Sequence, residues 1–278
     1  MKTYSWKGLI AKILVYLILI AIVITIFYPF VFMLLNSFKT KSEYYTNIFG
    51  LPRAIQFANY KIAMERFDIF RLGWHSLFVT VSSILINTLV ATMAAFGLSK
   101  LPFRGSKTIQ MLILGCMMIP GQVLMVPVYL IMSQIGLINT FASVILYYVA
   151  TAIPFAVFML TTQCGNIPNG VLEAAEIDGA SPPKIYVNII FPLLKPSVVT
   201  LVILNFLTFW NELLYAMLFL QTESTRTLTV EITTSIGRYT SNMPLLMTGL
   251  LINCIPTILI FVIFQKQIAK GVTAGAIK

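Results

Sequence analysis

The sequence predicts an all-α protein that crosses a membrane several times. Hydrophobic residues make up 58% of the 278-residue chain, charged residues only 10%, and the mean hydropathy is +0.90, whereas an ordinary soluble domain carries about 25% charged residues. Hydrocarbon offers the backbone no hydrogen-bond partners, so a spanning segment must be a helix or part of a closed barrel. The apolar runs here are too long and continuous for the alternating strands of a barrel.

Six apolar stretches are long enough to cross a bilayer, whose hydrocarbon core needs about 20 residues of helix. We expect transmembrane helices at residues 13–35, 76–98, 109–132, 141–160, 198–220 and 245–264. The first stretch follows three lysines, as in a signal peptide, but it is too long for one and lacks a cleavage site of small residues. We therefore expect this segment to be a retained signal anchor.

The distribution of basic residues predicts that both termini are cytoplasmic. In that orientation the inner segments carry eleven lysines and arginines, and the outer loops carry eight, six of them in the long loop 36–73. Long loops are translocated largely regardless of their charge, and without this loop the outer count is two. The basic residues lie between apolar runs and do not gather on one face, which argues against nucleic acid as a partner.

The predicted organisation follows from these spans. It comprises a cytoplasmic N-terminus at 1–12, a first transmembrane helix at 13–35, an extracellular loop at 36–73, a core transmembrane domain at 74–265 and a cytoplasmic C-terminal tail at 266–278.

One inner loop, at residues 161–197, carries three of the nine acidic residues and several prolines and glycines. Asn169 can cap a short helix, and Gly179 can adopt the left-handed conformation that ends it. Ser181 and Pro182 can then begin a second helix. The expected product is two short helices joined by a sharp bend at Gly179.

The first of these short helices has the composition of a docking element. Ala174 and Ala175 leave one side without bulk, so that another protein can approach the backbone closely, while Glu173 and Asp178 offer carboxylates to basic groups. A helix resting on lipid headgroups would instead carry lysine and arginine on its polar face.

The same loop resembles the EAA loop of permeases from ATP-binding-cassette (ABC) importers. The matching residues are Glu173-Ala174-Ala175 and Asp178-Gly179-Ala180, followed by Ile189-Ile190-Phe191-Pro192 and Lys195-Pro196. Other segments resemble the carbohydrate class related to the maltose permease, especially its second permease: Met117-Met118-Ile119-Pro120 with Pro127 and Gly136-Leu137, Phe209-Trp210-Asn211-Glu212, and the tail Gln265 to Lys278. Together these matches cover roughly residues 55–278.

The resemblance implies the type I ABC importer (MetI-like) transmembrane fold with six transmembrane helices and an EAA coupling loop at residues 165–192. It implies a heterodimer with a second, homologous permease, two ATPase subunits, and an extracellular solute-binding protein that delivers a sugar of the oligosaccharide class. The system would lie in membrane lipid, in the cytoplasmic membrane of a bacterium or archaeon. The residues that would contact the ATPase are Glu173, Ala174, Ala175, Asp178, Gly179 and Ala180.

The division of labour in such a system agrees with the sequence. A phosphate-binding G-x-x-x-x-G-K-[ST] motif does not occur in the chain, so we expect ATP and Mg²⁺ to be used by the partner ATPase. This chain would be a non-catalytic transport subunit that binds no cofactor or metal of its own.

Polar residues within the predicted spans are candidates for the translocation pathway. Glu212 is the only acidic residue in a predicted span, where a charge should face protein or water. Amides can bond sugar hydroxyls and a tryptophan can stack on a sugar ring, and the candidates are Asn87, Asn205, Trp210, Asn211, Glu212 and Asn253. A structural role between helices explains Glu212 equally well, and the asparagines carry the same two interpretations.

The remaining notable residues indicate no further chemistry. His75 has no acidic or cysteine partner at metal-ligand spacing, and the three cysteines lack paired spacing. Tyr147 and Tyr148 are expected in an interfacial aromatic belt, and Lys100 is expected to act as a topology signal.

Two other classes of protein are alternatives. A self-sufficient, ion-coupled secondary transporter should show internal repeats and several ionisable residues within its spans, and only Glu212 meets that description. A membrane enzyme would need grouped histidine, acidic or serine residues at one membrane face. Within ABC importers, a non-sugar solute stays an alternative, because amino-acid and peptide importers share the EAA loop.

Overall fold

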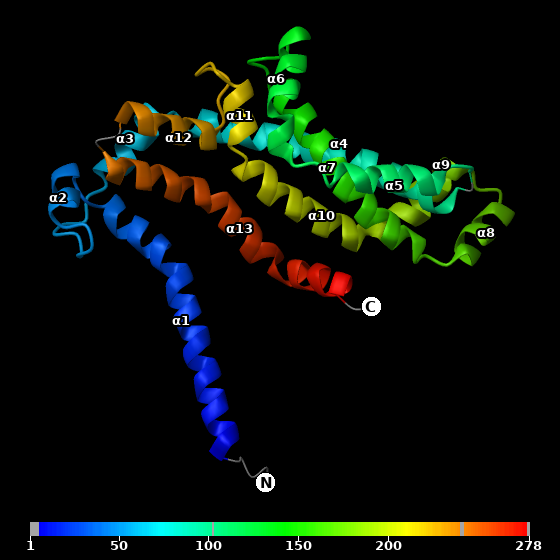
Figure 1. The fold of residues 1–278 in the computed structure, drawn as a ribbon, viewed down its shortest axis with the longest axis horizontal. Helices are drawn as coiled ribbons and strands as arrows, with labels where there is room; N and C mark the ends of the chain where they lie inside the picture. Colours follow the sequence, from blue (N-terminus) through cyan, green and yellow to red (C-terminus); the bar gives the residue numbers. More distant parts are fainter. Residues whose placement is uncertain (1–5, 102, 240–241, 277–278) are drawn as a thin grey trace. The chain divides into compact units, whose positions relative to one another are not determined.

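The computed structural model describes residues 6–101, 103–239 and 242–276, which form helices without any strand. The helices are α1 (Trp6–Ser37), α2 (Lys41–Thr46), α3 (Ala58–Arg66), α4 (Ile69–Lys100), α5 (Ser106–Cys116), the 3-10 helix η1 (Gly121–Leu124), α6 (Met125–Gln134), α7 (Phe141–Gly165), α8 (Asn169–Ile177), α9 (Pro182–Ile185), the π-helix η2 (Tyr186–Ile190), α10 (Phe191–Asn211), α11 (Leu214–Phe219), α12 (Leu228–Tyr239) and α13 (Met243–Ala276) (Figure 1). The ends of the predicted termini, residues 1–5 and 277–278, lie outside this description.

The chain divides into two compact units. The first consists of Met1–Ile69 and Ile232–Ile255, and the second of Phe70–Glu231 and Pro256–Lys278. The second unit therefore holds the whole predicted EAA loop.

Five helices in the described part of the chain are individually long and apolar enough to cross a membrane. They are Leu9–Ser37, Ile69–Lys100, Phe141–Gly165, Pro182–Asn211 and Met243–Gln267. A sixth crossing is possible only if Ser106–Cys116 and Gly121–Gln134 act together, and these two segments meet at 89°. Apart from this bend, the helices confirm the predicted polytopic all-α class.

Two predicted spans differ from the observed helices. The stretch 109–132 breaks before Pro120, because a proline lacks the N–H that would continue the helix and disfavours helical backbone in the residue before it. The stretch 198–220 is also not one helix, since α10 ends at Asn211 and α11 begins at Leu214. At its N-terminal end, the continuous helical segment that contains α10 begins at Pro182, well before residue 198.

Helix α1 carries apolar side chains on all sides, and none of its most hydrophobic window is buried in the chain. A helix that is apolar all round needs an apolar environment. Lipid provides that environment along a membrane span, and the predicted signal anchor corresponds to this helix.

The core of the second unit lies where α4, α7, α8 and α10 meet. Small residues on α4, including Ala91 and Ala95, are fully buried there against Leu160 and Leu201, and small residues let helix backbones approach closely in a membrane. The Thr92 hydroxyl and the Tyr186 hydroxyl lie 2.7 Å apart and add a polar tie to this packing.

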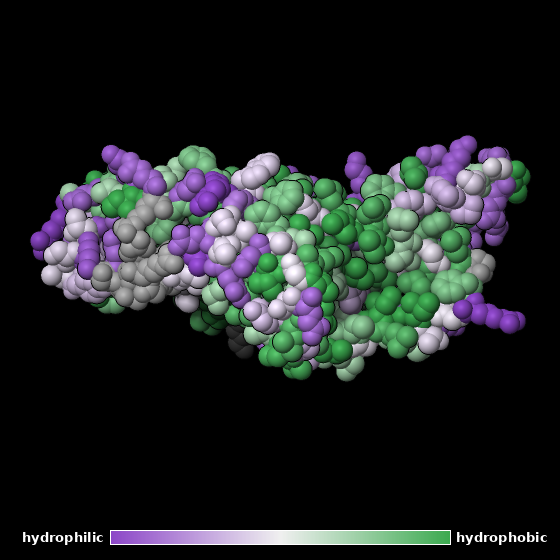
Figure 2. Space-filling view, turned by 90° about the horizontal axis from the view of Figure 1, so that it is seen from above, coloured by the Kyte–Doolittle hydropathy of each residue, from purple (hydrophilic) through white to green (hydrophobic). Residues whose placement is uncertain are grey.

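Apolar side chains also cover much of the molecular surface. Figure 2 shows broad hydrophobic areas on one face, with hydrophilic residues gathered in separate patches. Large apolar side chains stand exposed on most of the long helices, as expected for a surface solvated by lipid.

Candidate functional site

The predicted bend in the inner loop is confirmed, and its geometry is a Schellman motif at the end of α8. Gly179 has φ +77°, its N–H donates to the Glu176 carbonyl at 2.9 Å, and the Ala180 N–H donates to the Ala175 carbonyl at 2.9 Å. These two bonds satisfy carbonyls that the helix end would leave unpaired. A Cβ at Gly179 would meet nothing within 4 Å, so only the backbone conformation favours glycine here.

The start of α8 differs from the prediction. Pro168 is the N-cap residue, and Asn169 is the first residue of the helix. The Asn169 side chain does not cap the helix and instead accepts a hydrogen bond from Lys100 Nζ at 2.9 Å.

One face of α8 packs on the second unit and the other is exposed. Leu172 and Ala175 are buried in the core described above, whereas Glu173, Ala174 and Asp178 are exposed. The prediction that both alanines keep one side free of bulk is therefore wrong for Ala175. Consecutive residues of a helix lie about 100° apart, since a turn takes 3.6 residues, so neighbours cannot share one narrow face.

Two contributors to this site were missed at the level of sequence. Ile177 is 86% exposed at the tip of α8, next to the acidic residues. Lys100, expected to be only a topology signal, donates from Nζ to the carbonyls of Gly165 and Ile167 as well as to Asn169. It thereby ties the base of the loop to the end of α4, and nothing in the local sequence signals such a long-range contact.

A cavity of about 1000 Å³ lies beside α8. Its lining comes from the ends of α4 and α7, from α5 and from α8, and includes Lys107, Gln110, Thr162, Glu173 and Glu176. In Figure 1, α8 lies at one end of the second unit's long helices. The exposed acidic face, the apolar tip and the adjoining cavity together form a surface suited to contact with another protein.

Two of the predicted pathway residues bond each other. Asn205 Nδ2 donates to Asn87 Oδ1 at 2.9 Å, and Asn87 Nδ2 donates to the Val149 carbonyl at 3.4 Å. Both asparagines are buried. The contacts join α4, α7 and α10, so within this chain the pair connects helices.

Glu212 lies in the break between α10 and α11, not in the middle of a helix. Its Oε1 accepts from the Tyr215 N–H at 2.9 Å, and its Oε2 accepts from the Ala216 N–H and the Tyr148 hydroxyl, both at 3.0 Å. A carboxylate in this position caps the first turn of a helix and meets the positive end of its dipole.

An aromatic cluster surrounds this cap. The rings of Tyr147 and Tyr215 stack with centroids 3.6 Å apart, and those of Tyr148 and Phe209 stack at 4.9 Å. Tyr147 and Tyr148 are buried, so their predicted place in a lipid-facing belt is wrong. Their partners on α10 and α11 lie far along the chain and were not visible in the local pattern.

The other pathway candidates lie in different environments. Trp210 is buried and stacks on Phe206, with centroids 5.7 Å apart, whereas Asn211 is exposed and donates to the Leu207 carbonyl of its own helix. Asn253 is buried on α13. A role in the pathway stays a prediction for all six residues.

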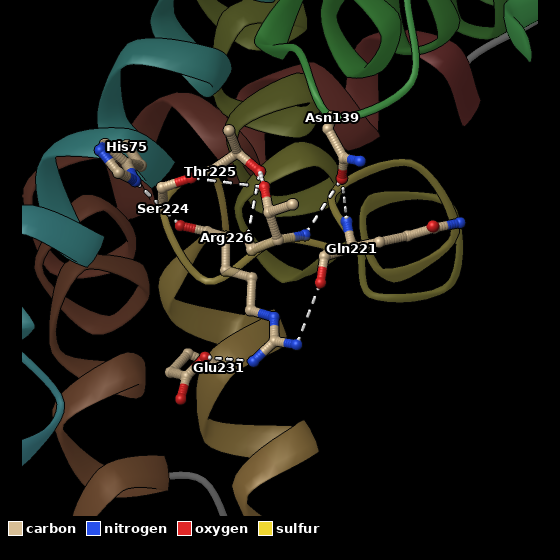
Figure 3. Close-up of polar contacts among 8 residues, drawn as sticks. His75, Asn139, Gln221, Ser224, Thr225, Arg226 and Glu231 are labelled. Atoms are coloured by element: carbon tan, nitrogen blue, oxygen red, sulfur yellow. Dashed lines mark hydrogen bonds and ion pairs between the residues drawn. The ribbon is translucent and has the colours of Figure 1, made fainter.

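The loop after α11 is held in place by contacts from distant segments (Figure 3). Asn139 Oδ1 accepts from the N–H groups of Gln221 and Thr222 at 2.7 and 3.0 Å, and Arg226 pairs with Glu231 at 2.9 Å. His75 Nδ1 donates to the Arg226 carbonyl at 3.0 Å. Within the described residues, no group of three histidine, cysteine or acidic side chains is placed to hold a metal ion.

These features describe a multi-pass membrane protein with one exposed loop that bends at Gly179. A family model described as "binding-protein-dependent transport system inner membrane component" matches residues 87–274. The chain belongs to this family, and it is therefore a transport subunit of an inner membrane.

Relatives along nearly the whole chain agree with this assignment. A putative ABC transporter permease, ORF2 of Caldicellulosiruptor sp. (strain Rt8B.4), is 34% identical and aligns over 90% of this chain and 91% of its own length. The melibiose/raffinose/stachyose import permease MelC of Bacillus subtilis (strain 168) is 32% identical over 91% of both chains.

A solved structure confirms the ABC importer permease fold. The similar chain belongs to a bacterial ABC transporter involved in the import of the acidic polysaccharide alginate, with a TM-score of 0.84. The match covers 96% of this chain and 99% of that one at 22% sequence identity.

Proposed function

We propose that this chain forms part of the pathway of an ABC importer for a sugar of the oligosaccharide class. The solute assignment rests on the sugars for which relatives of this chain are described as permeases. Besides MelC, these relatives include a permease for starch degradation products in Thermoanaerobacterium thermosulfurigenes, 33% identical, and a multiple sugar-binding transport system permease in Streptococcus mutans serotype c, 32% identical.

Helix α8 is the proposed contact with a separate ATPase. Its exposed residues offer two kinds of interaction: Glu173 and Asp178 provide charge, and Ile177 provides an apolar tip. Because Leu172 and Ala175 anchor the opposite face in the core, a force applied to α8 would pass directly to α4, α7 and α10. ATP and Mg²⁺ would be bound by the ATPase, two copies of which would serve this chain and a second, homologous permease.

The proposed orientation places both termini and α8 in the cytoplasm. The loop after α11 would then lie outside, where a solute-binding protein delivers the sugar. A structure similar in fold, with a TM-score of 0.66, is that of an alginate ABC transporter in complex with an alginate pentasaccharide-bound periplasmic protein.

Reconstitution tests the solute and the coupling together. The chain, its partner permease and the ATPase would be assembled in nanodiscs with the solute-binding protein, and ATP hydrolysis would be measured with raffinose, malto-oligosaccharides, arabino-oligosaccharides or amino acids. We expect one class of oligosaccharide to stimulate hydrolysis. Stimulation by amino acids alone would refute the sugar assignment, and solute accumulation by this chain alone in vesicles without nucleotide would refute the dependence on an ATPase.

A further inference from the structure

The segment between α1 and α3 is a small, firmly held scaffold built around Lys39. This side chain is fully buried, and its ammonium donates to the carbonyls of Asn47, Ile48 and Gly50 at 2.6, 3.1 and 2.7 Å. All three ammonium protons of a lysine can therefore be satisfied by the backbone of the loop. The loop is wrapped around a cation that the chain itself supplies.

Further bonds fix the backbone of the same loop. The Glu43 carboxylate accepts from the Arg53 N–H at 2.6 Å, and the Asn59 amide donates to the carbonyls of Ser37 and Lys39 at 2.7 and 2.8 Å. Gly50 packs so closely on the Asn47 side chain that a Cβ would lie 2.1 Å from its Oδ1. The tip of the loop is thus held by hydrogen bonds, and the rings of Phe38, Phe57 and Tyr60 pack together within the same segment.

This scaffold presents large apolar side chains outward. Phe49 is 80% exposed, Leu51 72% and Ile55 68%. A flexible loop could fold such residues inward, but here the backbone bonds hold them in the open. Exposed apolar groups on a rigid support mark a contact surface.

Phe49 lies beside the last turns of α1. Its ring lies 6.0 Å from that of Phe32 on α1, and Phe32 in turn stacks with Tyr28 at 6.1 Å. Phe32 lies five residues before the end of α1, or about 7–8 Å along the helix axis. Phe49 therefore continues the apolar, exposed surface of α1 at the level of its last turns.

The charges around the tip favour a lipid surface. Residues 48–52 carry no charge, whereas Lys41 and Arg53 are exposed on either side of them. Basic side chains that flank an apolar tip can reach phosphate groups while the tip enters the acyl region.

We propose that the loop tip, residues 48–55, is a membrane anchor that inserts Phe49 and Leu51 into the leaflet in which α1 ends. For a chain with a cytoplasmic N-terminus this is the outer leaflet. The anchor fixes the end of α1 and the scaffold around Lys39 at a set depth, independently of which solute the transporter carries.

Photocrosslinking identifies the occupant of this surface directly. The photoreactive residue p-benzoylphenylalanine would replace Phe49, Phe27 or Lys61, one position at a time, in the assembled transporter in nanodiscs of phosphatidylethanolamine and phosphatidylglycerol. Phe27 is exposed on α1 and sets the yield of a lipid-facing side chain, and Lys61 is exposed on α3 of the same unit and serves as the polar control. We expect phospholipid adducts at position 49 at a yield close to that at 27 and several-fold above that at 61, measured by intact-mass spectrometry.

Two results would overturn the anchor. One is an adduct at position 49 with the second permease or the solute-binding protein, and the other is a lipid yield at 49 no higher than at 61. Sugar-stimulated ATP hydrolysis measured on the same nanodiscs separates this outcome from the proposed function, because a lipid adduct without sugar stimulation would leave the anchor intact while refuting the solute assignment.

Discussion

Lys39 and Lys100 show how a charged residue can act as a structural tie in this chain. Each ammonium bonds several backbone carbonyls rather than a carboxylate. Burial lowers the pKa of Lys39, and the Glu43 carboxylate opposes this effect. In the sequence Lys100 is a predicted topology signal and Lys39 is one of the basic residues of the long loop 36–73, yet in the structure each closes a loop that would otherwise leave carbonyls without donors.

Removing the ammonium of Lys39 should unfold its loop locally. In Lys39→Met the apolar stem is kept, but three carbonyls lose their donor, and an unsatisfied buried acceptor costs about 1–3 kcal/mol. We expect a lower thermal midpoint in detergent and faster proteolysis between residues 40 and 57. Lys41→Met, an exposed neighbour, is the matched control, and equal behaviour of the two variants would contradict the tie.

Substitutions of Glu212 can distinguish a structural role of this residue from a role in the translocation pathway. Glu212→Ala removes the acceptors for the Tyr215 and Ala216 N–H groups, and loss of a helix cap typically costs about 1 kcal/mol. Glu212→Gln keeps one acceptor oxygen. If the residue is only a cap, transport should follow stability, with Gln between Glu and Ala. A Gln variant of near-native stability that no longer transports would instead place the carboxylate in the pathway, and Thr208→Ala gives the baseline for an exposed polar residue on α10.

At the scale of elements, α8 is a short helix with one anchored and one exposed face. Reversing the exposed charge in Glu173→Lys should leave the buried face untouched, because Leu172 and Ala175 carry the packing. We expect normal membrane insertion but weaker co-purification of the ATPase and lower solute-stimulated hydrolysis. Glu65→Lys on α3 reverses another exposed charge outside the loop, and it should change neither quantity. Full ATPase retention in Glu173→Lys would count against the coupling contact.

Local signals predicted the elements that depend on local bonds. The bend after α8 needs only residues within six positions of each other, so Gly179 and its neighbours indicate it directly. The break before Pro120 was not predicted, because apolar residues continue across it. The length of an apolar run does not show whether the helix changes direction within it. The bond between Glu212 and the Tyr148 hydroxyl could not be predicted, since the two residues lie 64 positions apart. The same limit applies to the contacts of Lys100 with the base of the loop and to the burial of Ala175.

At the scale of the whole molecule, the described helices allow five crossings of the membrane, or six if the bent pair acts as one span, but they do not fix the direction of crossing. The proposed function needs α8 in the cytoplasm and the Lys39 scaffold outside. The proposal therefore needs the segment after α7 and the segment after α1 to lie on opposite sides of the membrane. A test of orientation must therefore probe both segments in the same protein.

Cysteine labelling of intact cells tests this sidedness. In a background with Cys116, Cys164 and Cys254 replaced by alanine, single cysteines would be placed at Ser42 on α2 and at Ser181 just after the bend, both of which are exposed. A membrane-impermeant maleimide should label Ser42→Cys in intact cells and Ser181→Cys only after permeabilisation, because basic residues are retained on the inner side unless they lie in a long loop. Labelling of Ser181→Cys in intact cells would place α8 outside, where no ATP-driven partner could reach it, and would refute both the orientation and the coupling role of α8.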